Sequence, residues 1–192
     1  MADSVIIPPQ EIIGPLDGVW DASLFFEILL SKNKLAKEFD FRFCRVSGLE
    51  GFEQALHEVQ NTINFFCVSD VSDGYLDLDN TPSTRKVKTV FMAMRHKAED
   101  MNLRTYSLNV MRELFRQLMS VLIQQRTLLE EKCIYIDHRI KFHEIDRYFF
   151  SGGSCAYFQV AVDVFTNLCF NKDEWNEDIS RIFTNNFTKN FT

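Results

Sequence analysis

The stretch that decides the fold is Cys133–Asp146, which reads CIYIDHRIKFHEID. Apolar and polar side chains alternate along it, and the apolar set consists of Ile134, Ile136, Ile140 and Phe142. Successive side chains on a β-strand point to opposite faces, so this alternation predicts a long strand with one buried and one wet face. A second alternating strand is predicted over Ala156–Phe165. The turn Ser151–Ser154, which reads SGGS, joins the two strands into a hairpin.

A long amphipathic helix is predicted just before this hairpin, over Leu103–Gln125. Its apolar residues recur every three or four positions, which gives a helix one buried face; they are Leu103, Tyr106, Val110, Met111, Leu114, Phe115, Leu118 and Leu122. A second amphipathic helix is predicted over Phe52–Ile63. These two helices are expected to pack on the sheet.

Shorter elements complete the predicted domain. A short helix follows Trp20, with Asp21 as its N-cap, and Phe39–Phe43 is extended. Three further strands are predicted, with a turn at Asp73-Gly74 before the second; they cover Asn64–Ser69, Tyr75–Asp79 and Lys86–Met94. We therefore expect a single α+β domain with a mostly antiparallel sheet, in the order α-β-β-β-α-β-β.

The two ends of the chain are predicted to be extended arms that flank a domain at residues 20–175. Residues 1–19 are rich in proline and glycine, which break regular structure. Residues 176–192 place phenylalanines four apart among asparagine and threonine, a composition that cannot close a core of its own. We expect both arms to pack on a neighbouring subunit, with candidate interface residues Ile6, Ile7, Phe183, Phe187 and Phe191.

The composition excludes some classes of function. The chain has 192 residues and a formal net charge of −6, which argues against a nucleic-acid binder because such proteins need a basic footprint. It does not exclude a protein that encircles DNA without gripping it. No run of apolar residues is long enough to span a membrane, and the first residues lack the basic start of a signal peptide. The 19 phenylalanines fit either a Phe-rich core or a surface that another subunit covers.

The cysteines favour free thiols in a reducing cytoplasm. Their number is odd and no C-x-x-C motif occurs; they are Cys44, Cys67, Cys133, Cys155 and Cys169. Most are expected to be buried and chemically inert.

No group of residues predicts catalysis, a cofactor or a metal site. Asp70–Asp79 contains four aspartates and a glycine, but their spacing misses the calcium-loop pattern, so a solvated hairpin is the preferred interpretation. His138 and His143 are five apart on a predicted strand and point to opposite faces. We therefore expect no enzyme, although the Asp70–Asp79 loop together with His96 would be the starting point for one.

A basic cluster lies on the strand over Lys86–Met94 and just before it. Its members are Arg85, Lys86 and Lys88. They are candidates for contact with an acidic neighbouring subunit or a phosphate backbone. The alternative is an edge strand that uses charge to prevent aggregation.

Several runs resemble a known family. They are VSGLEGFE at 46–53, VKTVFMAMRHK at 87–97, MRELFRQ at 111–117 and EIDRYFF at 144–150. These runs and the order of elements are similar to tail-terminator and head–tail completion proteins of tailed phages. More specifically, they resemble a structural protein of phages that infect Bacteroidales, including the crAss-like phages. The resemblance covers Trp20 to Trp175 and carries no catalytic residues with it.

The resemblance implies a structural virion protein. Such a protein forms a ring, a hexamer or a dodecamer, in the neck or tail, where it joins the portal or connector to the tail-tube proteins around the DNA channel. It would assemble in the host cytoplasm, and DNA would only pass through its lumen. The alternative is a cytoplasmic, non-catalytic binding or adaptor module of the same fold.

Overall fold

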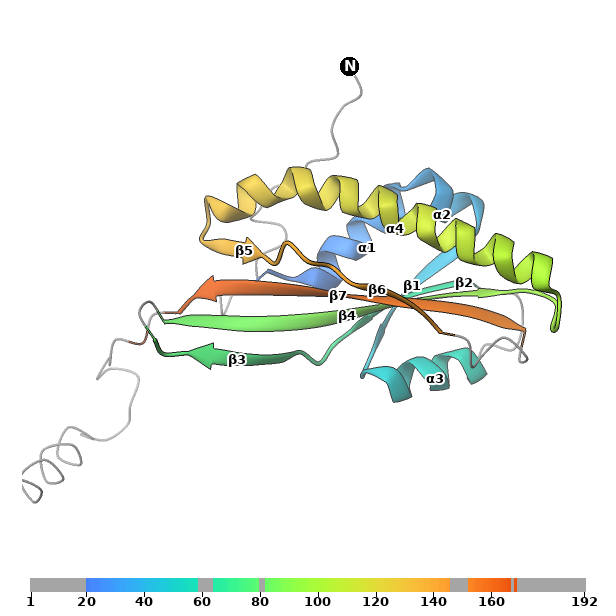
Figure 1. The fold of residues 1–192 in the computed structure, drawn as a ribbon, viewed down its shortest axis with the longest axis horizontal. Coiled ribbons are helices and arrows are strands. Elements are labelled where there is room, and N and C mark those ends of the chain that lie inside the picture. The colour runs from blue at the N-terminus through green and yellow to red at the C-terminus, as the bar shows by residue number, and fades with distance from the viewer. Residues whose placement is uncertain (1–19, 59–63, 80–81, 146–151, 167, 169–192) are drawn as a thin grey trace, which may run out of the picture.

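The computed structural model describes residues 20–58, 64–79, 82–145, 152–166 and 168 (Figure 1). In chain order, the elements are α1 (Ala22–Lys32), α2 (Lys34–Glu38), β1 (Phe41–Val46), α3 (Leu49–Glu58), β2 (Asn64–Ser69), β3 (Asp73–Asp77), β4 (Ser83–Arg95), α4 (Met101–Glu130), β5 (Ile134–Ile136), β6 (Phe142–Ile145) and β7 (Gly153–Phe165). This arrangement confirms the predicted α+β domain with a mostly antiparallel sheet.

The sheet has seven strands arranged around one long antiparallel pair. β4 and β7 are in register from Ser83 opposite Phe165 to Arg95 opposite Gly153. β2 and β3 pair with successive parts of the other edge of β4. β5 and β6 do the same along the outer edge of β7. Among the described strands, β1 and β2 form the one parallel pair.

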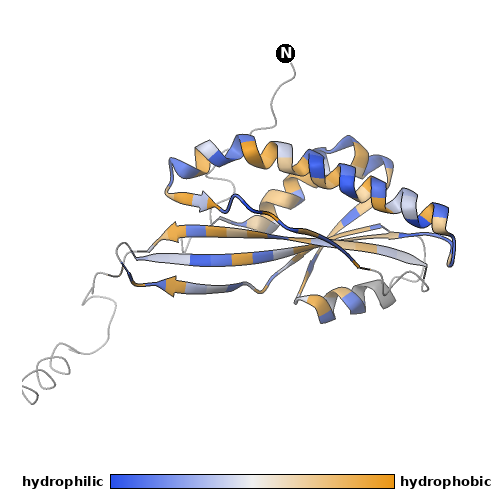
Figure 2. Ribbon diagram, viewed as in Figure 1, coloured by the Kyte–Doolittle hydropathy of each residue, from blue (hydrophilic) through white to orange (hydrophobic). Residues whose placement is uncertain are grey.

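Helices cover the two faces of the sheet unequally. Figure 1 shows α1, α2 and α4 on one face and α3 on the other. The main core lies beneath α1 and α4, where Phe26 packs edge-on against Phe158 with ring centroids 5.6 Å apart. Hydrophobic residues, orange in Figure 2, recur along the strands and along α4, and their buried members form one core cluster. Phe25, Phe26, Phe52, Phe66 and Phe158 are fully buried, so many of the described phenylalanines build the core.

A smaller core lies beneath α3. Phe52 of α3 stacks on Phe91 of β4 with ring centroids 4.7 Å apart. The other buried members of this cluster come from four strands; they are Val46, Phe65, Cys67, Ala93 and Cys155. α3 begins three residues earlier than predicted, and the predicted end at Ile63 lies outside the described residues.

The helix caps follow from local chemistry. The Asp21 carboxylate accepts a hydrogen bond from the Leu24 N–H at 2.9 Å, so the predicted cap of α1 is confirmed. Asp100 caps α4 in the same way and accepts bonds from Asn102 and Leu103. α4 is longer than predicted at both ends, and near its C-terminus it buries Leu129 completely.

The predicted strand Cys133–Asp146 is interrupted in the structure. It forms two short strands, β5 and β6. The Asp137 N–H still donates to the Ala161 carbonyl oxygen of β7 at 2.9 Å, and the chain leaves the ladder over the next four residues, 138–141. The Asp137 carboxylate accepts the Arg139 N–H at 2.9 Å, which offers the backbone an alternative to pairing with β7. Ile136, Val160 and Val162 are buried on the predicted face. Ile140 was predicted to share this face, but it is half-buried and lies in the segment that joins β5 to β6.

The predicted turn at Asp73-Gly74 is wrong, because both residues belong to β3. Gly74 faces Lys86 of β4 in the ladder. A Cβ atom at Gly74 would lie 1.9 Å from the Arg85 carbonyl oxygen, so the close approach of the β4 backbone requires glycine here.

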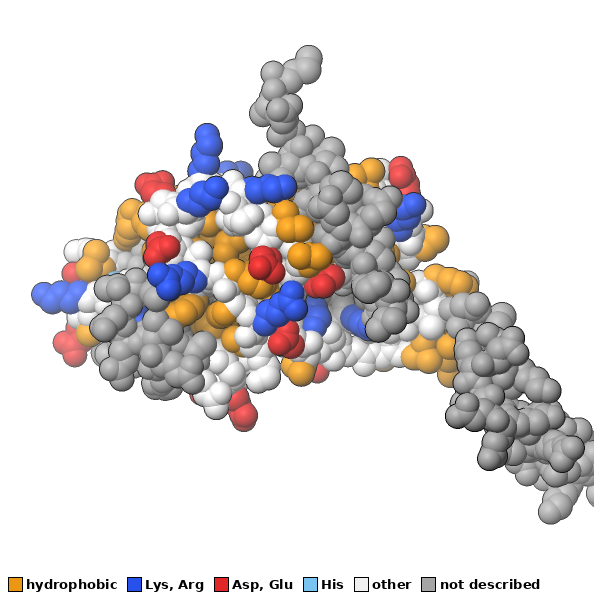
Figure 3. All heavy atoms as spheres, turned by 180° about the vertical axis from the view of Figure 1, so that it is seen from behind, with side chains coloured by type: hydrophobic (Ala, Val, Ile, Leu, Met, Phe, Trp, Pro, Cys, Tyr) orange, Lys and Arg blue, Asp and Glu red, His pale blue; other side chains and the backbone are white. Residues whose placement is uncertain are grey.

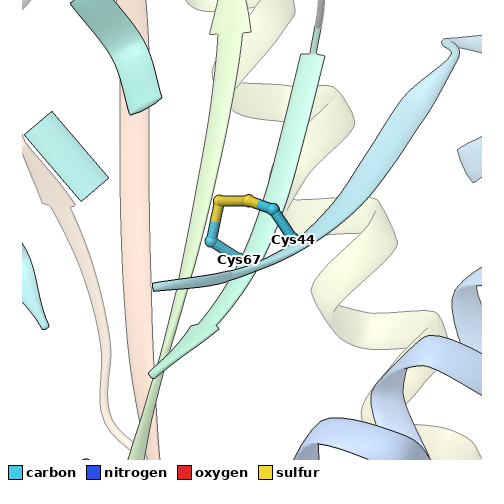
Figure 4. The surroundings of a disulfide bond; sticks show 2 residues. All are labelled: Cys44 and Cys67. Atoms are coloured by element: carbon cyan, nitrogen blue, oxygen red, sulfur yellow. A yellow bond between two sulfur atoms is a disulfide. The ribbon is translucent and has the colours of Figure 1, made fainter. Parts of the chain in front are cut away.

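The prediction of free thiols is wrong for two cysteines. Cys44 of β1 and Cys67 of β2 are directly opposite in the parallel ladder, with Cα atoms 4.6 Å apart, and they form a disulfide (Figure 4). Cys133 is exposed and Cys155 is buried. Cys169 lies outside the described residues. The pairing joins residues 23 apart in sequence, and only the strand register brings them together.

The register of β7 predicts opposite effects for two adjacent substitutions. Val160 is fully buried beneath α4, whereas Gln159 is exposed on the other face. Val160→Asp places an unpaired charge in the core and is expected to cost several kcal/mol, enough to unfold a domain of ordinary stability. Gln159→Asp is the matched control and is expected to change the free energy of unfolding little. Denaturant unfolding measures both, and a cooperatively folded Val160→Asp protein would contradict the register.

The disulfide predicts a specific pattern of alkylation. In native, unreduced protein we expect a maleimide to label Cys133 and to leave Cys44 and Cys67 unmodified until the protein is reduced. Reduction is expected to lower the free energy of unfolding by about 3 kcal/mol, because the cross-link restricts the unfolded chain. Peptide mass spectrometry identifies the labelled residues. Labelling of Cys44 before reduction is the result that disagrees with the bond.

Candidate interaction surface

Arg85, a predicted interface residue, bridges three strands within its own subunit. It lies on the sheet face opposite α4. Its guanidinium donates hydrogen bonds to Asp163 of β7 at 2.8 Å and to Asp137, just after β5. The three side chains are about a quarter to a third exposed. Two carboxylates therefore already compensate the charge that was expected to meet a neighbouring subunit.

The pKa shifts in this cluster follow from its hydrogen bonds. The Arg139 N–H, and next the Arg85 guanidinium, lower the pKa of the Asp137 carboxyl below its ordinary value of 3.8. The hydrogen bond to Asp137 in turn raises the pKa of Arg85. Sequence analysis missed this cluster, because its members are 52 and 78 residues from Arg85. The available signal was the alternation of side chains along each strand, which places Arg85, Asp137 and Asp163 on the same face of the sheet.

Lys86 and Lys88 lie on the opposite face of β4 from Arg85. The Lys88 ammonium donates to the carbonyl oxygens of Ser69 at 3.0 Å and Asp70 at 2.5 Å, which ties β4 to the end of β2. Burial lowers the pKa of Lys88. Lys86 is half-buried. The edge-strand interpretation of this basic cluster is wrong, because β4 has strands on both sides.

The aspartates of Asp70–Asp79 do not converge. Within the described parts of the chain, no group of three or more histidine, cysteine, aspartate or glutamate side chains is placed to hold a metal ion. Asp73 and Asp77 lie on one face of β3, and the Asp77 carboxylate accepts the Asp79 N–H at 2.9 Å. The segment instead combines exposed carboxylates with exposed apolar side chains.

His96 contacts a serine that sequence analysis did not single out. Its Nε2 atom lies 2.9 Å from the Ser154 hydroxyl oxygen, and its Nδ1 atom lies 2.9 Å from the Lys97 carbonyl oxygen. This is a hydrogen-bonded Ser–His pair, but Ser154 is only 2% exposed. A substrate cannot reach that hydroxyl in this conformation. The pair joins the end of β4 to the start of β7.

Among the grooves formed by the described residues are three of about 400–450 Å³ each. The first, here called the helical groove, lies between α1, α2 and α4 and is lined by Leu29, Lys32, Asn33, Lys34, Leu35, Glu38, Gln117, Leu118 and Val121. The second lies beside the start of α3 on the opposite face of the sheet. The third lies between α4 and the segment that joins β5 to β6. All three have apolar floors with polar rims, which suits contact with another protein better than capture of a small molecule.

Charge is mixed over the surface. On the face seen in Figure 3, basic and acidic side chains alternate with hydrophobic ones and form no large patch of a single sign. A face of this kind offers no continuous track for a phosphate backbone. The other predicted interface residues, Ile6, Ile7, Phe183, Phe187 and Phe191, lie outside the described residues.

No protein-family model matches the chain, and no curated protein matches it either. None of the helices in the described ranges has the length and apolar character needed to cross a membrane.

The Arg85 cluster predicts a pH-dependent contribution to stability. The folded-state pKa of Asp137 is depressed, so its ionised form stabilises the fold above the ordinary value of 3.8, and this contribution is lost as the pH falls through the lowered pKa. Asp137→Asn is therefore expected to lower the melting temperature at neutral pH, and the difference from the native protein is expected to shrink in acid. Glu131→Gln, at an exposed carboxylate without an ion pair to a described residue, is the control. Thermal melts across this pH range test it; a constant difference would contradict the assignment.

Proposed function

We propose that the chain is a structural virion subunit that forms a ring in the neck or tail of a tailed phage. In this role it joins the portal or connector to the tail around the DNA channel. The resemblance of four sequence runs to tail-terminator and head–tail completion proteins introduced this hypothesis. The observation that carries it in the structure is an apolar edge of the sheet with which no other described strand pairs.

That edge is β3 and the residues that flank it. Four apolar side chains are exposed there, Val71 at 60%, Tyr75 at 60%, Leu76 at 46% and Leu78 at 68%. Among the described strands, β3 pairs only with β4, so its outer backbone groups are open to another chain. Natural proteins protect exposed sheet edges, and an apolar one marks a place where another protein binds.

The charge of the chain fits a passive role around DNA. A net charge of −6 repels the phosphate backbone, so a ring of such subunits lets DNA slide through its lumen without gripping it. Arg85 and Lys88, the strongest basic candidates, are engaged within the subunit. The proposed partners are therefore other copies of the chain and the adjoining portal, connector or tail-tube proteins.

The disulfide sets a condition on this proposal. Disulfides are rare in a reducing cytoplasm, so the proposal places formation of the Cys44–Cys67 bond after the particles leave the host cell. Until then the two strands are held by their parallel ladder alone.

The direct test is the mass of the full chain in solution and its appearance by negative-stain electron microscopy. We expect closed rings whose mass is six or twelve times that of the 22.5 kDa chain. Labelling with an antibody is expected to mark the neck or tail of virions. A chain that stays monomeric at all concentrations and labels no particle would overturn the proposal and would favour the adaptor module.

The C-terminal segment provides a second test. Deletion of residues 177–192 is expected to leave the melting temperature of the subunit unchanged and to weaken ring assembly, because the segment is proposed to pack on a neighbour. Full-length protein with Phe183→Ala, Phe187→Ala and Phe191→Ala is expected to show the same loss, since each buried ring contributes roughly 1.5–3 kcal/mol before ordering costs. Unfolding of the truncated subunit would assign the segment to the core instead.

A further inference from the structure

We propose that neighbouring copies join head to tail, with the acidic strand of one copy seated in the helical groove of the next. The acidic strand is residues 73–79, which comprise β3 and the two residues after it. This inference rests on the proposed function and specifies the contact that builds the ring. The two contacting surfaces are identified by their shape, exposure and charge.

The acidic strand combines exposed apolar side chains on both of its faces with a single sign of charge. Tyr75, Leu76 and Leu78 are 46–68% exposed. Asp73, Asp77 and Asp79 are also exposed, no lysine or arginine lies between residues 70 and 79, and none of the three forms an ion pair with a described residue. Burial of these apolar side chains favours association, but only a surface with basic groups at its rim also compensates the carboxylates.

The acidic strand is a poor partner for a second copy of itself. In a symmetric antiparallel pairing centred on Tyr75, Asp73 of each copy would lie opposite Asp77 of the other. Like charges directly opposite each other destabilise a strand pair. The edge is therefore expected to meet a different surface of the neighbouring copy.

The helical groove has the complementary properties. Its floor is apolar, with Leu29 and Leu118 buried and Leu35 and Val121 half-buried. Lys32 and Lys34 are exposed at its rim, and neither forms an ion pair with a described residue. The groove has a volume of about 450 Å³, room for two or three apolar side chains such as Leu76 and Leu78.

Local sequence explains why the groove is basic. Asn33 ends α1 and caps α2, where its carboxamide oxygen accepts the Ala36 N–H at 2.8 Å. Its amide nitrogen donates to Gln117 of α4 at 2.8 Å, which holds the corner between the helices against the long helix. This corner presents the lysines on either side of Asn33 to solvent. Glu38 is the one acidic residue in the lining.

The other two grooves fit an acidic partner less well. The groove between α4 and the β5–β6 segment includes Arg126, but Glu130 already pairs with that arginine at 2.6 Å, and Asp137 adds negative charge. The groove beside α3 is itself lined by Asp73 and contains no lysine or arginine. Of the three grooves, the helical groove therefore has the apolar floor and the basic rim that best complement the acidic strand.

The positions of the two surfaces suit a closed ring. β3 reaches one end of the long axis of the molecule, and α2 lies toward the other (Figure 1). A contact between two different surfaces of identical subunits is heterologous, and its repetition closes a ring when the rotation between subunits allows it. A subunit cannot bind its own acidic strand in its own helical groove, because the two surfaces lie toward opposite ends of the molecule. Each copy therefore binds the next one.

Charge reversal tests the contact in the full chain. The groove variant carries Lys32→Glu and Lys34→Glu, and the strand variant carries Asp77→Lys and Asp79→Lys. Each variant alone is expected to assemble at least about tenfold more weakly, because like charges then meet at the contact. A control with Lys132→Glu and Lys141→Glu, two exposed lysines elsewhere, is expected to assemble like the native chain. Circular dichroism melts confirm that every variant is folded.

The decisive measurement is an equal mixture of the two folded variants. The acidic strand of the groove variant matches the intact groove of the strand variant, and the reversed strand matches the reversed groove. Light scattering is therefore expected to show that the mixture regains rings of even order. Failure of the mixture to recover, or undiminished assembly of either variant alone, overturns the proposed contact.

Cross-linking separates this inference from the proposed function. In a Cys133→Ser background, Leu78→Cys and Val121→Cys treated with a short bismaleimide are expected to give a ladder of covalent oligomers, and either cysteine alone is not. Rings without this ladder would show that the chain assembles through another surface, so the contact fails and the proposed function stands. A native chain that forms no rings would overturn both.

Discussion

The antiparallel pairing of β4 with β7 is the constraint on which the rest of the structure depends. The two strands are paired over 13 residues, from one end of the sheet to the other. Every other strand except β1 pairs with one of them, and β1 is held through β2. α4 runs along the same pair and buries its apolar stripe on it. A shift of this register by one residue would move each side chain of β7 to the opposite face of the sheet and exchange core for surface.

This central pair also divides the chemistry of the chain between two faces. On one face, residues such as Val90 and Phe158 close the main core under α1 and α4. On the other, α3 covers one end, and Arg85 with its two carboxylates occupies the uncovered part. The basic residues that resembled a binding patch are thereby satisfied inside the subunit. At β3, exposed apolar side chains lie beside carboxylates without an ion pair to a described residue, and at the corner between α1 and α2 two lysines lack such a partner. The proposed association between copies of the chain uses these two surfaces.

Side chains that act together in this fold come from strands far apart in sequence. The disulfide joins cysteines 23 residues apart, and Arg85 meets Asp163 across 78 residues. Each partner alternates correctly on its own strand, so its face was predictable. The residue that it contacts on another strand was not predictable, because alternation along a strand determines the direction of a side chain and does not determine which strand lies beside it. His96 and Ser154 illustrate the same point at the other end of the β4–β7 pair.

The sequence by itself determined the elements whose signal is local. The helical periodicity of α4, the cap at Asp21 and the alternation in β7 were predicted correctly, because they depend on residues within a few positions of one another. The predicted buried face of α4 was wrong at its N-terminal end, where Leu103 and Tyr106 are exposed. Tertiary structure decided the rest. The close approach of the Arg85 carbonyl to Gly74 turned an apparent turn into a strand, and the bond from Arg139 to Asp137 split another. The order of strands placed β4 inside the sheet and Cys44 opposite Cys67, since hydrogen bonding between distant segments, and not local preference, chooses the neighbours of a strand.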